Sequence, residues 1–211
     1  YSENIEEHKI NIFLTFTNKL STPIFLNKFK YKRGVCPTVV FNLFSLSSFF
    51  KKANYIRINN INQIDSQSFK DIYRPDNAMF KSKEFYKWRY SNYPIETLHI
   101  LKISENSQTI GYAILREYKK KGVIILLLMD IILSDKKFFP AIIDAVYRYS
   151  SKNKYFGTLM FKLPDINLPR RLFQLEFKNK FNFLVKGLND SETEYFSQIQ
   201  YNMFFGDLDI F

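Results

Sequence analysis

Cysteine and histidine are scarce in this sequence, and their scarcity excludes several kinds of chemistry. Cys36 is the single cysteine, so one chain can form neither an internal disulfide nor a cysteine-rich metal site. The two histidines, His8 and His99, are far apart in the sequence, and no acidic cluster lies between them. We therefore expect neither a histidine-based zinc site nor a Ser/His/Asp triad, and we predict no metal ligands.

Long apolar runs are also missing. The longest, Val123–Leu133, is interrupted by Asp130, whereas a membrane-spanning helix needs about 20 apolar residues. The chain opens on Tyr1 rather than on methionine, and no basic-then-apolar leader follows. We expect a cytoplasmic protein without a transmembrane helix, whose sequence begins inside a longer one.

Acidic residues are outnumbered by basic ones, and the formal net charge is +11. An excess of this size favours an anionic partner, such as a phosphate-bearing cofactor, a nucleic acid or a membrane surface. A solvated lysine-rich surface explains the charge equally well. The hydrophobic content of 46% is sufficient for a substantial core.

The most regular stretch is predicted as strand, turn, strand and helix. Residues 109–118 mix β-branched and aromatic side chains, and Val123–Leu133 has the length and composition of a strand buried on both faces. Ser134 and Asp135 are good N-cap residues for a helix whose apolar face begins at Phe138. A buried strand that leads into a helix N-terminus is where α/β proteins usually hold an anion.

The remaining elements are predicted from periodicity, caps and turn residues. Residues 45–52 are predicted as a connector and 187–194 as a polar loop. Strands are expected at 10–17, 38–44, 55–61, 96–104, 155–163, 181–186 and 197–205, and helices at 23–29, 65–73, 82–90 and 169–178.

The first residues fit poorly as the start of a domain, because strand, helix and strand follow one another without earlier partners. The fragment 21–44 also resembles 167–187, since both place a lysine-rich helix end before a strand. We predict that 1–44 is the C-terminal remnant of a first lobe, that 45–52 connects the lobes, and that 53–211 is a second, related domain.

The order of elements resembles that of the GNAT superfamily of N-acetyltransferases. The residues that carry the resemblance are Phe85–Tyr90 with Pro94, Ile110–Arg116, Met129–Ile132 and Gly206–Asp209. More closely, the chain is similar to GNAT-like proteins of bacterial surface-polysaccharide gene clusters. The resemblance implies an α/β (α+β) fold with a mixed central sheet flanked by helices. It also implies transfer of an acetyl or other acyl group from acyl-CoA to an amine, such as an amino sugar of a polysaccharide precursor.

The resemblance places acetyl-CoA between the central strand and the following helix. GNAT proteins usually carry there a loop like Arg/Gln-x-x-Gly-x-Gly/Ala, whereas Leu133–Pro140 contains no glycine. The helix N-terminus and two lysines are the expected phosphate contacts, with a solvated helix end as the alternative, and Asp135 would oppose a phosphate unless it caps the helix. The predicted cofactor-binding residues are Ile131, Ile132, Leu133, Ser134, Lys136, Lys137 and Phe138.

Asp130 is the leading candidate for a catalytic residue. A lone carboxylate inside an apolar run is costly to bury, so it must be paired or have a raised pKa. As a general base it would deprotonate the acceptor amine, while amides at a strand bulge near Ile131–Leu133 polarise the thioester. The structural alternative is a buried salt bridge to Arg89 or Arg116.

Further candidates follow from the resemblance. Trp88, Arg89 and Tyr90 would lie beside the acceptor, where an aromatic ring and a guanidinium suit a sugar or carboxylate; core packing is the alternative. Tyr201 is a candidate proton donor to the leaving thiolate. The acidic stretch Asp207–Asp209 either reaches the acceptor site, binds a cation or is a solvated chain end.

Two other functions remain open. A two-lobed relative of the aminoacyl transferases that build cell-wall peptide bridges would use charged tRNA, which suits the net charge. A non-catalytic GNAT-like module would bind a protein or polyanion. We favour a small-molecule amine over nucleic acid as partner, and we make no prediction of the oligomeric state. DNA reading in particular is not expected, because no basic recognition helix with a helix-turn-helix spacing stands out.

Overall fold

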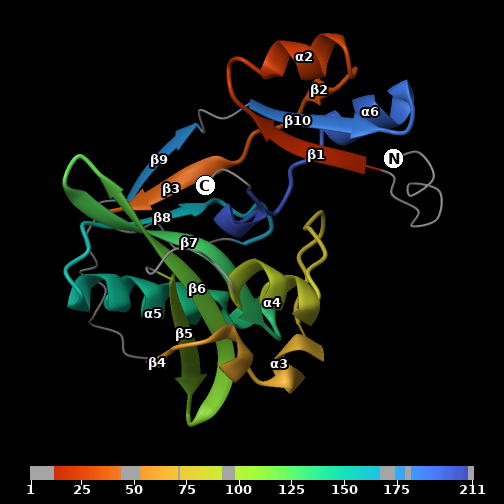
Figure 1. Cartoon of the computed structure of the whole chain (residues 1–211). Helices are drawn as coiled ribbons and strands as arrows, with labels where there is room; N and C mark the ends of the chain where they lie inside the picture. The colour runs from red at the N-terminus through yellow and green to blue at the C-terminus, as the bar shows by residue number, and fades with distance from the viewer. Residues whose placement is uncertain are drawn as a thin grey trace.

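The chain folds into two β-sheets with helices packed around them (Figure 1). The computed structural model describes residues 12–43, 53–70, 72–91, 98–166, 174–178 and 182–208. Among these residues a seven-stranded sheet has the order β4-β5-β6-β7-β8-β3-β9, and a three-stranded sheet has the order β1-β10-β2. The architecture confirms the predicted mixed sheet flanked by helices.

The elements have the following bounds. The strands are β1 (Ile12–Thr17), β2 (Lys32–Arg33), β3 (Thr38–Asn42), β4 (Asn54–Ile58), β5 (Leu98–Glu105), β6 (Gln108–Lys120), β7 (Val123–Leu133), β8 (Thr158–Phe161), β9 (Gln174–Lys178) and β10 (Asn182–Gly187). The helices are α2 (Thr22–Asn27), α3 (Ser66–Lys70), α4 (Lys83–Ser91), α5 (Phe139–Lys152) and α6 (Asp190–Ser197), with short 3₁₀ turns η2 (Ile61–Gln63), η3 (Lys136–Phe138) and η4 (Phe205–Asp207).

The large sheet is antiparallel except where β7 meets β8. That parallel pairing is limited to Leu126 opposite Thr158 and Leu127 opposite Leu159. Beyond Leu127 the two strands are no longer paired, although β7 continues to Leu133. The second half of β7 therefore has no β8 partner along the edge that faces away from β6.

A β-bulge interrupts the pairing of β7 with β6. Leu128 lies opposite Leu115 and Asp130 lies opposite Ile114, so Met129 is the extra residue. The sequence predicts a bulge near Ile131–Leu133; the bulge lies just before this stretch, at Met129, and those three residues pair with β6 in regular register. A bulge re-aims the side chains next to it, and here the affected neighbour is Asp130.

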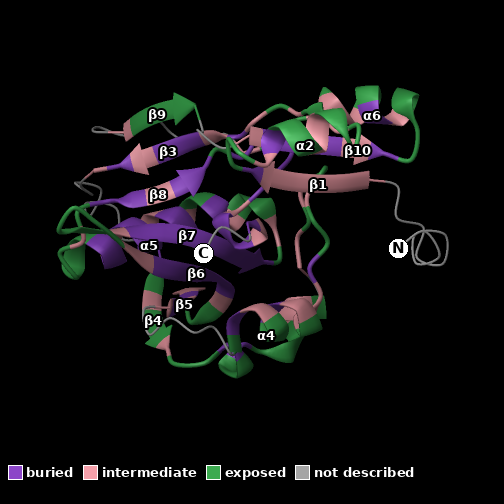
Figure 2. Cartoon of the chain, turned by 45° about the horizontal axis from the view of Figure 1, so that its top comes forward, coloured by how far each residue is buried: buried purple, intermediate pink, exposed green. Residues whose placement is uncertain are grey.

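Helix α5 covers one face of the large sheet. Its broad apolar face, which includes Phe139, Ile142 and Val146, packs on buried residues of β5, β6 and β7 such as Leu101 and Leu115. Figure 2 shows β7 and β8 as buried strands, with β9 exposed at the sheet edge. The continuous apolar run of β7 is thus explained by burial on both faces.

Helix α4 and the small sheet cover the opposite face. Tyr86 and Tyr90 of α4 pack with Tyr112 of β6, and Phe183 and Val185 of β10 belong to the same apolar cluster. The C-terminal turn η4 lies in this layer, against β7. The second face of β7 is therefore covered by segments that are remote in sequence.

The predicted helix at 169–178 was wrong for the residues that the structure describes there. Gln174–Lys178 forms β9, which pairs antiparallel with β3 from Thr38 to Asn42. Pairing with a distant strand satisfies backbone groups that a helix would have bonded locally, and this tertiary effect overrides local propensity.

The predictions for residues 187–194 and 197–205 were also wrong. The segment expected as a polar loop contains the start of α6. The Asn189 side chain caps this helix, because its Oδ1 atom accepts a hydrogen bond from the Glu192 amide. The expected strand at 197–205 is instead the end of α6 and an irregular segment, with a single bridge from Asn202 to Ala78.

The N-terminal segment is built into both sheets. β1 pairs with β10, and β3 lies between β8 and β9. The division into a remnant lobe and a second domain stays a prediction, and residues 45–52 lie outside the described part. No described helix is long and apolar enough to span a membrane.

Candidate functional site

A buried cluster of charged groups lies beside the bulge in β7. The Lys81 Nζ atom is 2.5 Å from Oδ1 of Asp130 and 2.6 Å from Oδ1 of Asp207. The Tyr90 hydroxyl donates a hydrogen bond to the other Asp130 oxygen, Oδ2, at 2.6 Å. All three charged side chains are at most 7% exposed, so one ammonium group is held between two carboxylates away from bulk solvent.

Four separate segments position these groups. Asp130 follows the bulge in β7, and Tyr90 lies in the last turn of α4. Lys81 precedes α4, whose first turn is fixed by a hydrogen bond from the Phe85 amide to the Ser82 hydroxyl. Asp207 is the last residue of η4, and its Oδ2 atom accepts a hydrogen bond from the Phe204 amide.

Burial and neighbouring charges set the protonation of the cluster. Desolvation raises the pKa of Asp130 to about 6; Lys81 opposes this rise and Asp207 adds to it. Desolvation lowers the pKa of Lys81, but the two carboxylates outweigh it, so the pKa of that ammonium is above its usual value. Near neutral pH, Asp130 is therefore a mostly ionised base with raised proton affinity, and Lys81 is a cation.

A small pocket adjoins the cluster. Its volume is about 40 Å³, which is room for a few water molecules at most. Each carboxylate oxygen has more than one acceptor position, so Asp130 can bind Lys81, Tyr90 and a further donor in the pocket. The pocket is lined by Ile72, Tyr73, Arg74, Pro75, Ala78, Met79, Lys81, Tyr86, Asp130, Ile131, Asn202, Phe204 and Asp207.

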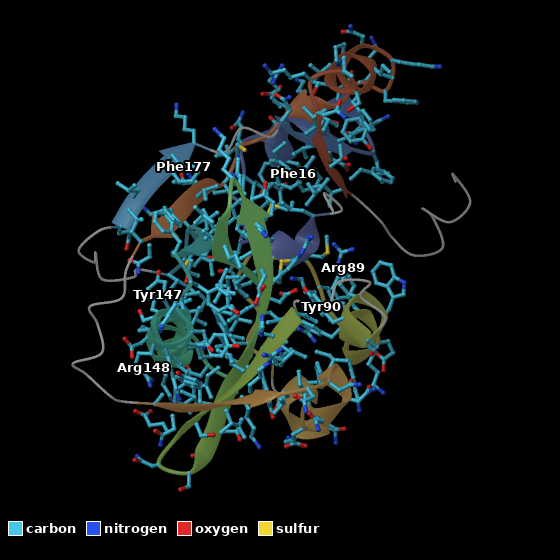
Figure 3. The ribbon with its side chains drawn as sticks, turned by 60° about the vertical axis from the view of Figure 1, so that its left-hand side comes forward. Phe16, Arg89, Tyr90, Tyr147, Arg148 and Phe177 are labelled. Atoms are coloured by element: carbon cyan, nitrogen blue, oxygen red, sulfur yellow. The ribbon has the colours of Figure 1, made fainter. Side chains whose placement is uncertain are left out.

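The structure brings together only part of the predicted site. Asp130 and Tyr90 are hydrogen-bonded, and Arg89 donates from Nη2 to the carbonyl of Leu208 at 2.6 Å. Figure 3 shows Arg89 and Tyr90 between α4 and the large sheet. Trp88 is 69% exposed, so it is neither a core residue nor part of the pocket lining. The charged partner of Asp130 is Lys81 rather than either arginine considered from the sequence.

Among the described residues, no hydrogen bond joins Tyr201 to Asp130. Tyr201 is in the irregular segment after α6, where its hydroxyl donates to the carbonyl of Phe196 at 3.0 Å. Burial raises its pKa to about 12, and it is absent from the residues that line the small pocket. Its predicted role as a proton donor receives no geometric support.

In the loop before α5, the backbone amides that could bind a phosphate donate hydrogen bonds to acceptors of the loop itself. The Lys137 amide donates to the Asp135 carboxylate, and the Phe138 and Phe139 amides donate to the carbonyls of Asp135 and Lys136. The next residue, Pro140, has no amide hydrogen. Residues 137–140 therefore offer no free backbone amide, so this part of the loop does not fit the pyrophosphate of acyl-CoA.

The unpaired edge of β7 is covered as well. Phe205 of η4 stacks on Phe161 of β8 with ring centroids 4.3 Å apart. The next residue, Gly206, lies against the Met129 carbonyl, because a Cβ atom at Gly206 would be 2.6 Å from that oxygen. The C-terminal segment thus lies between β7 and β8 where the strands diverge. The side chains of Ile131, Ile132 and Leu133 are buried in the two cores.

Sequence reasoning missed two residues that shape this site, Lys81 and Asn202, and it named Gly206 only as part of the resemblance. Lys81 and Asp130 are 49 positions apart, and no local pattern connects them. A general signal was present, since a buried carboxylate requires a partner, but it does not say which of many cations supplies it.

Comparison with known proteins was informative only at the level of structure. No protein-family model and no curated protein sequence matches the chain. A GCN5-related N-acetyltransferase from Anabaena variabilis has a similar structure, with a TM-score of 0.61 at 12% identity over 89% of this chain and 48% of that protein. One from Kribbella flavida has a TM-score of 0.55 at 11% identity, over 93% of this chain and 47% of that one.

A third similar structure is a protein of unknown function from Enterococcus faecalis that is described as a probable N-acyltransferase. Its TM-score is 0.55 at 8% identity, and the match covers 88% of this chain and 47% of that one. The chain thus spans about half the length of these three structures. These similarities show that it has the GNAT fold, and at such identities they show the fold alone.

Proposed function

We propose that this protein is a GNAT-fold N-acyltransferase that transfers an acyl group from an activated donor to an amine. The observation that carries the proposal is Asp130, a fully buried carboxylate with a pKa of about 6 beside a small pocket at the bulge of β7. A general base works best when its pKa lies near the working pH, because it is then mostly ionised and still binds a proton well. The fold of the similar acetyltransferases supports this chemical class.

The chain's own residues would act on the proton of the amine. The amine nitrogen attacks the acyl carbonyl, the bond to the leaving group breaks, and Asp130 accepts the proton that the nitrogen releases. Because the pocket has room for water, one water molecule can relay this proton. Lys81 stabilises the ionised carboxylate, and the Tyr90 hydrogen bond fixes the orientation of its Oδ2 atom.

Acetyl-CoA is the donor that the sequence resemblance implies. The Lys137 amide already donates a hydrogen bond to the Asp135 carboxylate, so this amide is not free to bind the pyrophosphate of CoA. This misfit favours a second candidate, transfer of an aminoacyl group from charged tRNA, because that donor needs no pyrophosphate cradle. The net charge of +11 suits a nucleic acid as well. An amino sugar is the acceptor that the resemblance implies.

Single-turnover assays with radiolabelled acetyl-CoA and with charged tRNA would test both donors against a panel of amines that includes glucosamine. We expect one donor to support transfer, and we expect Asp130→Asn to lower the rate at least about 100-fold, as loss of a general base does. Asp144→Asn is the matched control, since Asp144 pairs with Arg148 on α5, and it should retain the rate.

Absence of transfer from either donor by folded protein would contradict the proposal, as would equal rates for the two variants. Salt-sensitive RNA binding without any transfer would then favour a non-catalytic binding module.

A further inference from the structure

A larger apolar cavity lies next to the small pocket. Its volume is about 440 Å³, within the range of small-molecule sites. It is bounded by β1, by residues 77–80 and by residues 196–203. None of the described residues that line it is charged. They are Ile12, Leu14, Asn77, Ala78, Met79, Phe80, Phe196, Ile199, Tyr201, Asn202 and Met203.

The cavity and the small pocket share part of their walls. Ala78, Met79 and Asn202 line both. A molecule in the cavity would therefore have one end at the pocket that contains Asp130. In Figure 1 the segment before α4, drawn in yellow, reaches toward β1.

Asn202, one of the residues that line both the cavity and the small pocket, has an unused acceptor. Its Nδ2 atom donates to the carbonyl of Asp76 at 2.6 Å and to the carboxylate of Asp165, and these bonds fix the orientation of the amide. The residue is 2% exposed, and its Oδ1 atom has no hydrogen-bond partner among the described residues. A buried acceptor without a donor is unfavourable, so the site calls for an N–H or O–H group.

Together these features define the chemistry of a ligand. The cavity requires an apolar chain, and the junction requires a hydrogen-bond donor at its end. An alkyl carboxylate would instead direct its acceptors toward Asn202 Oδ1 and toward the carboxylates of Asp130 and Asp207. A sugar would place its hydroxyl groups against apolar walls that offer few partners. An alkyl amine meets both requirements.

We propose that the cavity binds the alkyl chain of the acceptor amine, with the amine N–H donating to Asn202 Oδ1 beside Asp130. This assignment rests on the proposed function, because it names the acceptor class of that same site. The acceptor would be an aliphatic primary amine rather than an amino sugar.

Calorimetry with n-octylamine, ethylamine and octanoate, below micellar concentrations, tests the site without any acyl donor. We expect octylamine to bind at least about 30-fold more tightly than ethylamine, because each buried methylene adds favourable transfer free energy. Octanoate should bind at least about 10-fold more weakly than octylamine, since it presents no donor to Asn202.

Two substitutions probe the two halves of the site. Leu14→Trp fills the cavity and should weaken octylamine binding at least about 10-fold, whereas Leu175→Trp, on the exposed strand β9, should leave it unchanged. Asn202→Leu should reduce the preference for octylamine over octanoate, and the part that remains comes from the carboxylates of Asp130 and Asp207. Circular dichroism confirms that each variant is folded, and the paired ligand comparison within Asn202→Leu is independent of a general loss of affinity.

The outcomes separate this inference from the proposed function. Octylamine binding without acyl transfer from either donor would leave the ligand site intact and overturn the catalytic proposal. Acylation of glucosamine without octylamine binding would overturn the ligand site and support the catalytic proposal. Equal binding of octanoate and octylamine, or octylamine binding that survives Leu14→Trp, would also overturn this inference.

Discussion

Gly206 lies directly against Asp130. A Cβ atom at Gly206 would be 2.5 Å from Oδ2 of Asp130, 2.6 Å from the carbonyl of Met129 and 2.1 Å from the hydroxyl of Tyr90. The turn η4 thus approaches the β7 bulge so closely that no side chain fits between them. This contact joins the C-terminal segment, the strand bulge and α4 in one packed unit around the candidate base.

Gly206→Ala should disrupt that unit. The new methyl group would force apart Tyr90 and Asp130, and we expect a loss of about 1–3 kcal/mol in the free energy of unfolding, typical of overpacking. The rate of amine acylation should fall as well, because the hydrogen bond from Tyr90 orients Asp130. Urea denaturation and single-turnover rates measure the two effects. Gly122→Ala is the control: its backbone has a φ of +80° but its surroundings are open, so it should lower stability without changing the acylation rate.

Lys81→Met tests the buried ion cluster. Removing the ammonium leaves two carboxylates buried beside each other, and we expect a loss of about 3–5 kcal/mol in the free energy of unfolding. Lys87→Met, at an exposed position of the adjacent helix, should change it by less than about 0.5 kcal/mol. Similar values for the two variants in chemical denaturation would mean that the cluster contributes little to folding.

The pH dependence of acylation should report the pKa of Asp130. The base must be ionised, so kcat/KM should rise with pH and level off above about pH 6. Lys81 lowers the pKa of Asp130 and Asp207 raises it. Lys81→Met should therefore move the rise to higher pH, and Asp207→Asn should move it to lower pH. Shifts in the same direction would exclude Asp130 as the group that titrates, provided that circular dichroism shows both variants folded.

Asp135→Gly should create room for an anion before α5. The substitution releases the Lys137 amide and removes a carboxylate that pairs with the Lys137 ammonium. Calorimetry should show weak or no acetyl-CoA binding by the unmodified chain and at least about tenfold tighter binding by the variant. Lys136→Ala/Lys137→Ala in the variant background should reverse the gain. Micromolar acetyl-CoA binding by the unmodified chain would contradict the misfit inferred from the loop.

His99 should make the protein acid-sensitive. Its Nδ1 atom is 3.0 Å from the Tyr149 hydroxyl and its Nε2 atom is 3.0 Å from Glu117 Oε1. Burial, with a smaller contribution from Arg57, lowers its pKa below the usual value of about 6.5. The unfolded chain therefore binds more protons in the window just below pH 6.5, so the free energy of unfolding should fall as the pH drops through it. The raised pKa of Asp130 acts in the opposite direction, so the test compares thermal melts of the unmodified chain and His99→Gln between pH 5 and 7. The variant should lose less stability as the pH drops.

Local sequence patterns predicted much of the large sheet. The hairpin β6–β7 and helix α5 lie where alternation, apolar runs and the Asp135 cap place them. The predictions failed toward the C-terminus, where the structure has β9 and α6. β9 depends on pairing with β3, which no local signal reveals. The α6 cap, Asn189 followed by Glu192, was visible in the sequence but was interpreted as a loop.

The sequence by itself determined that Asp130 would be buried and would need a partner or a raised pKa, because a lone carboxylate within an apolar strand is costly to bury. Only the tertiary structure decided that Lys81, Asp207 and Tyr90 surround it, and that Asn202 lies at the junction with an apolar cavity. The physical reason is that burial follows from the composition of one strand, whereas the identity of its partners depends on which distant segments the packed core brings within hydrogen-bond distance.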